Sequence, residues 1–74
     1  MNPYENLANA IVLKAVRDYR DVIRKLSRKR KNTAAKDTYD ECLRFFRSEW
    51  FGVLTELDPE KLIQKLNEEV GYDG

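Results

Sequence analysis

The sequence has no histidine, one cysteine and three glycines, and these shortages exclude several classes of site. Without histidine, no Ser–His or Cys–His pair can activate a nucleophile, and a transition-metal centre lacks its commonest ligand. Gly52, Gly71 and Gly74 are too dispersed to form a glycine-rich phosphate loop. Cys42 has no partner for a disulfide within the chain, and its position on an apolar stripe predicts a small buried side chain.

The carboxylates do not supply an alternative site. Asp37, Asp40 and Glu41 are expected to form an acidic turn that caps and solubilises a helix start rather than binding a divalent cation. Glu68 and Glu69 are adjacent and point in different directions on a helix, so they are poor candidates for a paired-carboxylate site. We therefore expect a protein that is not an enzyme and that uses no metal and no cofactor.

Long apolar runs are also missing. No stretch approaches the roughly 20 residues that span a bilayer, and the opening MNPYENLANA lacks the features of a secretory signal. Together with the lone thiol, this predicts a cytoplasmic protein with no membrane partner. The 74 residues are 42% hydrophobic and 36% charged, which is typical of one ordered domain, residues 1–74. A domain this small is marginally stable alone, so a homodimer is one expectation.

Helical periodicity explains the first third of the chain. Pro3 suits a first helical position, with Asn2 as the cap and Glu5 as the acid of a capping box. Apolar residues then recur at steps of three and four and predict a helix over about 3–29, roughly 40 Å long. The stripe consists of Ala8, Ile11, Val12, Ala15, Val16, Tyr19, Val22, Ile23 and Leu26.

A polar break at Asn32 and Thr33, either of which can cap a helix, separates this helix from the next one, expected over about 34–47. The apolar face of this second helix is predicted to contain Tyr39, Cys42, Leu43, Phe46 and Trp50. Ser48 resembles a new N-cap and Gly52 weakens a helix, so a short separate element is expected over 49–55.

Asp58-Pro59-Glu60 is a strong helix start, and Gly71 is a suitable stop. These signals predict a last helix over 59–70 and a frayed tail from Tyr72 to Gly74. No alternating run predicts a strand. The expected fold class is therefore all-α, a small three- or four-helix bundle with a long N-terminal helix.

Charge is sorted along the chain. Residues 24–36 contain seven basic residues and no acid, whereas residues 37–74 contain four basic and ten acidic residues. On a helical wheel, five basic residues fall within roughly a quarter of the circumference, on the side away from the stripe around Tyr19. These residues are Arg17, Arg20, Arg24, Arg28 and Lys31. The candidate nucleic-acid-binding residues are Arg17, Arg20, Arg24, Lys25, Arg28, Lys29, Arg30 and Lys31.

Three interpretations of this basic surface remain open. It can be a solvated face, or one paired with the acidic residues 56–69 of the same chain. It can bind the phosphate backbone of a nucleic acid without sequence preference. It can also bind an acidic protein surface.

A second cluster, of aromatic residues, lies between Phe45 and Phe51. One interpretation is that this segment is central and fills the core. The other is an exposed protein interface formed by Phe45, Trp50 and Phe51, which would serve dimerisation or a partner.

Residues 43–66, LRFFRSEWFGVLTELDPEKLIQKL, and residues 8–20, ANAIVLKAVRDYR, resemble small uncharacterised proteins carried by prophages and integrative elements of Gram-positive bacteria. The resemblance assigns no activity or functional residue. It implies a mobile-element context, in which small proteins bind DNA, replication machinery or host defence components. The expected function is a non-catalytic nucleic-acid-binding module; the alternative is a protein-interaction module, as a homodimer or a small inhibitor or adaptor, that uses residues 45–54.

Overall fold

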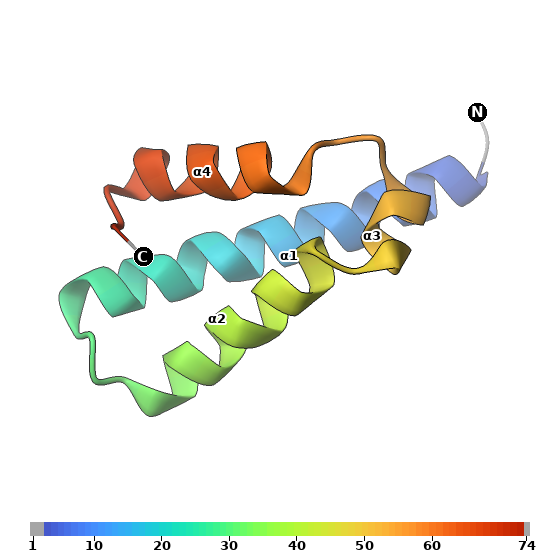
Figure 1. The fold of residues 1–74 in the computed structure, drawn as a ribbon. Helices are drawn as coiled ribbons and strands as arrows, with labels where there is room; N and C mark the ends of the chain where they lie inside the picture. The colour runs from blue at the N-terminus through green and yellow to red at the C-terminus, as the bar shows by residue number, and fades with distance from the viewer. Residues whose placement is uncertain (1–2, 74) are drawn as a thin grey trace.

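The computed structural model describes the backbone of residues 3–73 and the side chains of residues 6–73. Within these residues the helices are α1 (Pro3–Arg28), α2 (Thr33–Phe46), α3 (Glu49–Leu54) and α4 (Pro59–Val70), and no strand is present (Figure 1). The expected all-α bundle with a long N-terminal helix is confirmed. Each helix boundary lies within one residue of its expected position, while the expected cap by Asn2 and Glu5 lies outside the described side chains.

Local capping groups determine where the shorter helices begin. The side chain of Asn32 accepts a hydrogen bond from the Ala35 amide (3.1 Å), and Ser48 accepts one from the Phe51 amide (3.2 Å). Asp58 accepts from the amides of Glu60 and Lys61 at the start of α4. Each cap satisfies amides that have no partner in the first helical turn. The predicted caps Ser48 and Asp58 are thus confirmed.

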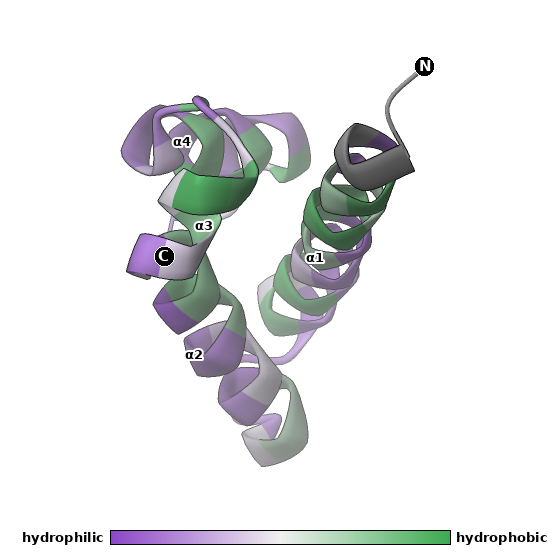
Figure 2. Cartoon of the chain, turned by 90° about the vertical axis from the view of Figure 1, so that its right-hand side faces the viewer, coloured by the Kyte–Doolittle hydropathy of each residue, from purple (hydrophilic) through white to green (hydrophobic). Residues whose placement is uncertain are grey.

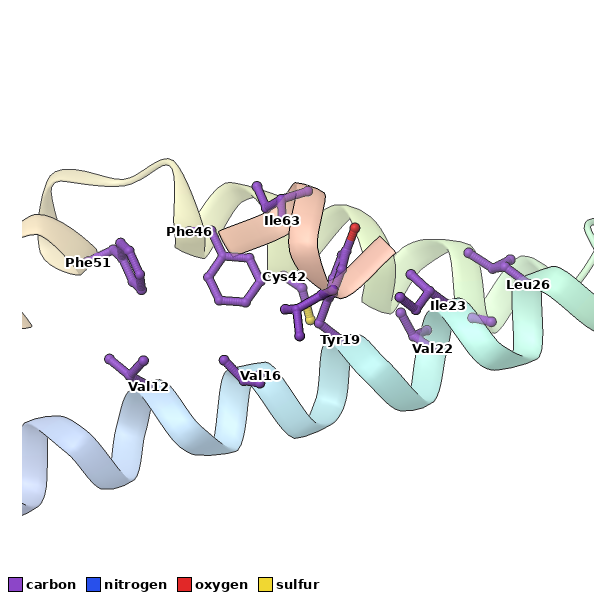
Figure 3. Packing of buried hydrophobic residues seen from close by; sticks show 12 residues of the cluster. Val12, Val16, Tyr19, Val22, Ile23, Leu26, Cys42, Phe46, Phe51 and Ile63 are labelled. Carbon is purple, nitrogen blue, oxygen red and sulfur yellow. The ribbon is translucent and has the colours of Figure 1, made fainter. Parts of the chain in front are cut away.

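The long helix α1 is the spine against which the other helices pack (Figures 1 and 3). The buried residues of its apolar stripe contact side chains from α2, α3 and α4, and the whole molecule measures 42 × 21 × 20 Å. The buried core contains Val12, Val16, Tyr19, Val22, Ile23, Leu26, Ala35, Cys42, Phe46, Phe51, Ile63 and Leu66.

The aromatic segment is part of this core. The rings of Phe45, Phe46 and Phe51 contact one another with centroids 5.6–5.8 Å apart, and Tyr19 contacts Phe46 edge-on at 5.6 Å. Edge-to-face packing of this kind is favourable beyond the apolar area that it buries. The expectation that Trp50 continues the Phe46 face is wrong, because its side chain is 54% exposed while Phe51 is 1% exposed.

The break between α2 and α3 explains why Phe51 is buried and Trp50 is exposed. Helix α2 ends at Phe46, and Ser48 is extended (φ −82°, ψ 157°) before α3 begins. The regular 100° rotation per residue therefore does not continue from Phe46 to Trp50. The new helix turns Phe51 toward Phe46 and leaves Trp50 in solvent.

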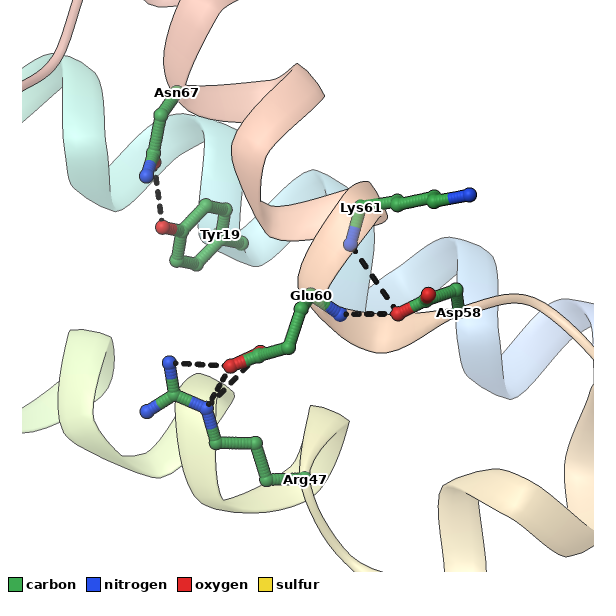
Figure 4. A network of polar contacts seen from close by, with 6 residues as sticks. All are labelled: Tyr19, Arg47, Asp58, Glu60, Lys61 and Asn67. Carbon is green, nitrogen blue, oxygen red and sulfur yellow. Dashed lines mark hydrogen bonds and ion pairs between the residues drawn. The ribbon is translucent and has the colours of Figure 1, made fainter.

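Two polar contacts fix α4 (Figure 4). The Tyr19 hydroxyl donates a 2.6 Å hydrogen bond to Asn67 Oδ1, and the Arg47 guanidinium pairs with Glu60 at 3.0 Å. The first contact joins α1 to the last turn of α4, and the second joins the end of α2 to its first turn. Burial raises the pKa of Tyr19, and the hydrogen bond to Glu60 raises the pKa of Arg47.

Tyr72 is ordered by its contacts, so the expectation that it belongs to a frayed tail is wrong. Gly71 is left-handed (φ 77°), and the Tyr72 amide donates to the Asn67 carbonyl at 2.8 Å. This Schellman-type turn reverses the chain. It brings the half-buried Tyr72 ring against Tyr39, with ring centroids 5.7 Å apart. Gly74 lies outside the described residues.

Candidate nucleic-acid interface

The predicted basic residues follow the second half of α1 and the turn after it. Arg17, Arg24 and Arg28 project from α1, where the apolar residues of the stripe face the core and leave these positions in solvent. Lys29, Arg30 and Lys31 lie in the turn that joins α1 to α2, which Figure 2 shows in the hydrophilic colour. All six side chains are exposed.

Two of the eight predicted residues pair with acids of the same chain. Arg20 Nε lies 2.7 Å from Glu69 Oε2 on α4, and Lys25 Nζ lies 3.0 Å from Asp21 on α1 itself. Within the described side chains, the other six form no ion pair. The chain therefore neutralises part of its own basic surface, as one of the three interpretations anticipated, but leaves most of it unpaired.

The position of Glu69 divides the predicted stripe into two parts. Around Arg20, α4 contributes carboxylates that would repel a phosphate, since Glu69 is accompanied by the exposed Glu68. Beyond Arg20 the surface is strongly cationic. We name this part the basic end; it consists of Arg24, Arg28, Lys29, Arg30, Lys31 and Lys36, all of which are exposed and, among the residues described, not ion-paired.

The predicted protein interface is mostly absent from the surface. Phe51 is buried, which contradicts its place in an exposed interface, and Phe45 is half-buried against the core; both rings join α2 to α3, as the core-filling interpretation of this segment expects. Of the three residues in the interface interpretation, Trp50 alone is exposed. The largest exposed apolar side chains are Leu7, Leu13, Trp50, Val53 and Leu57.

The structure also places the acidic residues of α2 and the single cysteine. Asp37, Asp40 and Glu41 lie within α2 rather than at its start, so the expected acidic turn is not formed. Cys42 is buried as predicted, and burial raises the pKa of its thiol, which disfavours the reactive thiolate. Across residues 6–73, no group of three or more potential ligands could hold a metal ion.

Three residues were not among the predicted site residues: Lys36, which belongs to the basic end, and Tyr39 and Tyr72, which lie beside it. Together with Arg30 they line one pocket between α2 and the chain after α4. Lys36 and Tyr39 carried a local signal, because Lys36 ends the basic segment 24–36 and Tyr39 lies three residues after it. Tyr72 carried none, since only the packing of α4 places it beside residues more than 30 positions away.

The comparisons with known proteins give no relative. No protein-family model, no curated protein and no solved structure matches the chain. Of the described helices, none combines the length and apolar character required to cross a bilayer.

Proposed function

We propose that this protein is a non-catalytic module that binds nucleic acid through the basic end. Binding would be mainly electrostatic and weak in sequence preference. Its setting would be the cytoplasm of a bacterium that carries a prophage or an integrative element, as the resemblance of residues 8–20 and 43–66 implies.

One observation carries this proposal: six exposed cations at one end of an elongated molecule have no carboxylate partner among the described residues. Each cation that contacts a phosphate releases a condensed counterion, and this release drives association. Arginine forms bidentate contacts with phosphate, which suits Arg24, Arg28 and Arg30. Exposed ion pairs are weak, about 0–1 kcal/mol, so Lys25 can exchange the Asp21 carboxylate for a phosphate at little cost. Arg20 stays outside the basic end, because Glu68 and Glu69 lie around it.

Salt dependence of binding to duplex DNA tests the proposal. Six phosphate contacts predict that the logarithm of the association constant falls with the logarithm of salt concentration with a slope of about −5. The variant Arg24→Ala/Arg28→Ala/Lys31→Ala should lower the magnitude of this slope by about 3 and weaken binding to all sequences alike.

The matched control is Arg44→Ala/Lys61→Ala/Lys65→Ala. It removes the same charge from exposed positions on α2 and α4 that belong to no ion pair in the described structure. Equal loss of affinity in both variants would mean that net charge, not the basic end, governs binding. Absent or salt-insensitive binding by the unmodified protein would refute the proposal and favour an acidic protein as the partner of the basic end.

A second candidate function is protein–protein contact, favoured by the exposure of Trp50 (54%), Val53 (76%) and Leu57 (53%). These residues lie on α3 and in the loop after it, toward the other end of the long axis from the basic end (Figure 1). A second copy of the chain is the simplest partner, since a small core gains stability from dimerisation. Sedimentation across concentration tests it: a dimer that Val53→Asp dissociates supports this function, and a monomer at all concentrations excludes the homodimer.

A further inference from the structure

A pocket of about 470 Å³ opens beside the basic end, within the size range of small-ligand sites. It forms where the end of α1, the first turns of α2 and the chain after α4 meet. The residues that line it are Leu26, Arg30, Lys36, Tyr39, Tyr72 and Asp73.

The aromatic wall of this pocket is held in place by the fold. Tyr39 stacks on the buried Tyr19 ring, with centroids 5.7 Å apart and planes inclined by 24°. Tyr72 meets Tyr39 edge-on at 5.7 Å, and the Gly71 turn fixes its backbone. Tyr39 and Tyr72 are both half-buried, so each ring keeps part of its surface open to a ligand.

The charged wall favours an anion. Arg30 and Lys36 line the pocket with a single carboxylate, Asp73, and within the described residues neither cation is ion-paired. Both cations act on the Tyr72 hydroxyl: burial raises the pKa of Tyr72, and Arg30 and Lys36 oppose that rise. The two positive charges therefore lie near the aromatic wall rather than away from it.

We propose that the pocket binds one nucleotide unit of a single-stranded nucleic acid, with the phosphate held by Arg30 and Lys36 and the base against Tyr39 and Tyr72. This inference rests on the proposed function, because it adds an unpaired-base site to the basic end. An anionic group beside an aromatic ring is the chemistry that these walls complement. A base in a duplex is already stacked on its neighbours, so the pocket selects single strands.

The test compares a labelled thymidine oligonucleotide with a duplex of the same length, by fluorescence anisotropy. Tyr72→Leu, which keeps an apolar side chain at this position, should weaken binding of the single strand roughly 5- to 100-fold, the cost of one lost stacking contact. Binding of the duplex should stay within about twofold, because Arg24, Arg28 and Lys31 are unchanged. Tyr72→Phe should retain single-strand affinity, since it keeps the ring.

Trp50→Leu is the matched control, because it removes an exposed aromatic ring on α3, which lies toward the other end of the molecule from the pocket (Figure 1). Trp50→Leu should leave the affinities for the single strand and for the duplex unchanged. Circular dichroism must show the same helicity in all variants. An added nucleoside monophosphate should displace the single strand more effectively than inorganic phosphate does, since phosphate alone lacks the ring.

The outcomes separate this inference from the proposed function. If Tyr72→Leu weakens single-strand and duplex binding equally, or weakens neither, the pocket takes no base and the inference is overturned, while duplex binding through the basic end still holds. If inorganic phosphate competes as well as the nucleotide, the site is only an anion site, which also overturns it. If the unmodified protein binds neither nucleic acid, both proposals fail.

Discussion

Replacing Tyr19 with phenylalanine tests how α1 holds α4. Tyr19 is fully buried, and its hydroxyl donates a 2.6 Å hydrogen bond to Asn67. A net loss of about 1 kcal/mol in the free energy of unfolding is expected at neutral pH, the typical value for one hydrogen bond. The loss is not larger because Asn67 is only half-buried, so water can donate a hydrogen bond to Asn67 Oδ1 in place of the Tyr19 hydroxyl.

The same variant should reverse its effect in alkali. Burial raises the pKa of Tyr19 above the usual value near 10. Above about pH 10 the unfolded chain therefore loses this proton while the folded chain retains it, so the unfolded state binds fewer protons and stability falls as pH rises. The fall is about 1.4 kcal/mol per pH unit, and it is absent in Tyr19→Phe.

Urea unfolding followed by far-ultraviolet circular dichroism measures both effects. The unmodified protein should be more stable than Tyr19→Phe by about 1 kcal/mol at neutral pH, and the two should be equally stable near pH 11. All other ionisable groups are common to the two proteins, so their effect on stability cancels in the comparison. If the difference in stability between the two proteins stays constant over this pH range, folding does not raise the pKa of Tyr19, and this prediction is wrong.

Two further predictions concern the pair Trp50 and Phe51 and the turn at Gly71. Phe51→Ala should cost about 3–5 kcal/mol, as much as the whole stability of a domain this small, whereas Trp50→Ala should change stability by no more than about 0.5 kcal/mol. Thermal unfolding checks this pair, and an equal effect of the two substitutions would contradict the assignment of Phe51 to the core. Gly71→Ala should destabilise by about 1–2 kcal/mol, because a left-handed backbone (φ 77°) strains any side chain although the space around it is open. Urea unfolding measures this cost, and a neutral result would mean that the turn before Tyr72 relaxes.

The helices could be predicted from sequence because their signals are local. Ser48 and Asp58 cap within three residues of themselves, and Gly71 ends α4 through its own backbone angle. The prediction for Trp50 is wrong because it extends the helical phase of residues 39–46 through the break that Ser48 marks. The direction of each side chain around the helix axis must be counted anew from each N-cap.

The site was predicted only in part, because its remaining features depend on packing over long sequence distances. The pairing of Arg20 with Glu69 joins residues 49 positions apart, so no local pattern contains it. The pocket likewise needs α4 to return along α1 before Tyr72 reaches Tyr39. The basic end itself was visible in the sequence, because residues 24–36 contain seven cations and no acid, and of these only Lys25 has a nearby carboxylate partner, Asp21.

Mapping amide chemical shifts by nuclear magnetic resonance during titration with DNA tests the central claim most directly. If the basic end and its pocket bind nucleic acid, salt-sensitive shifts will appear at residues 24–36 with a duplex, and also at residues 72 and 73 with a single strand. Shifts confined to residues 49–57, or none at any DNA concentration in low salt, would contradict this claim.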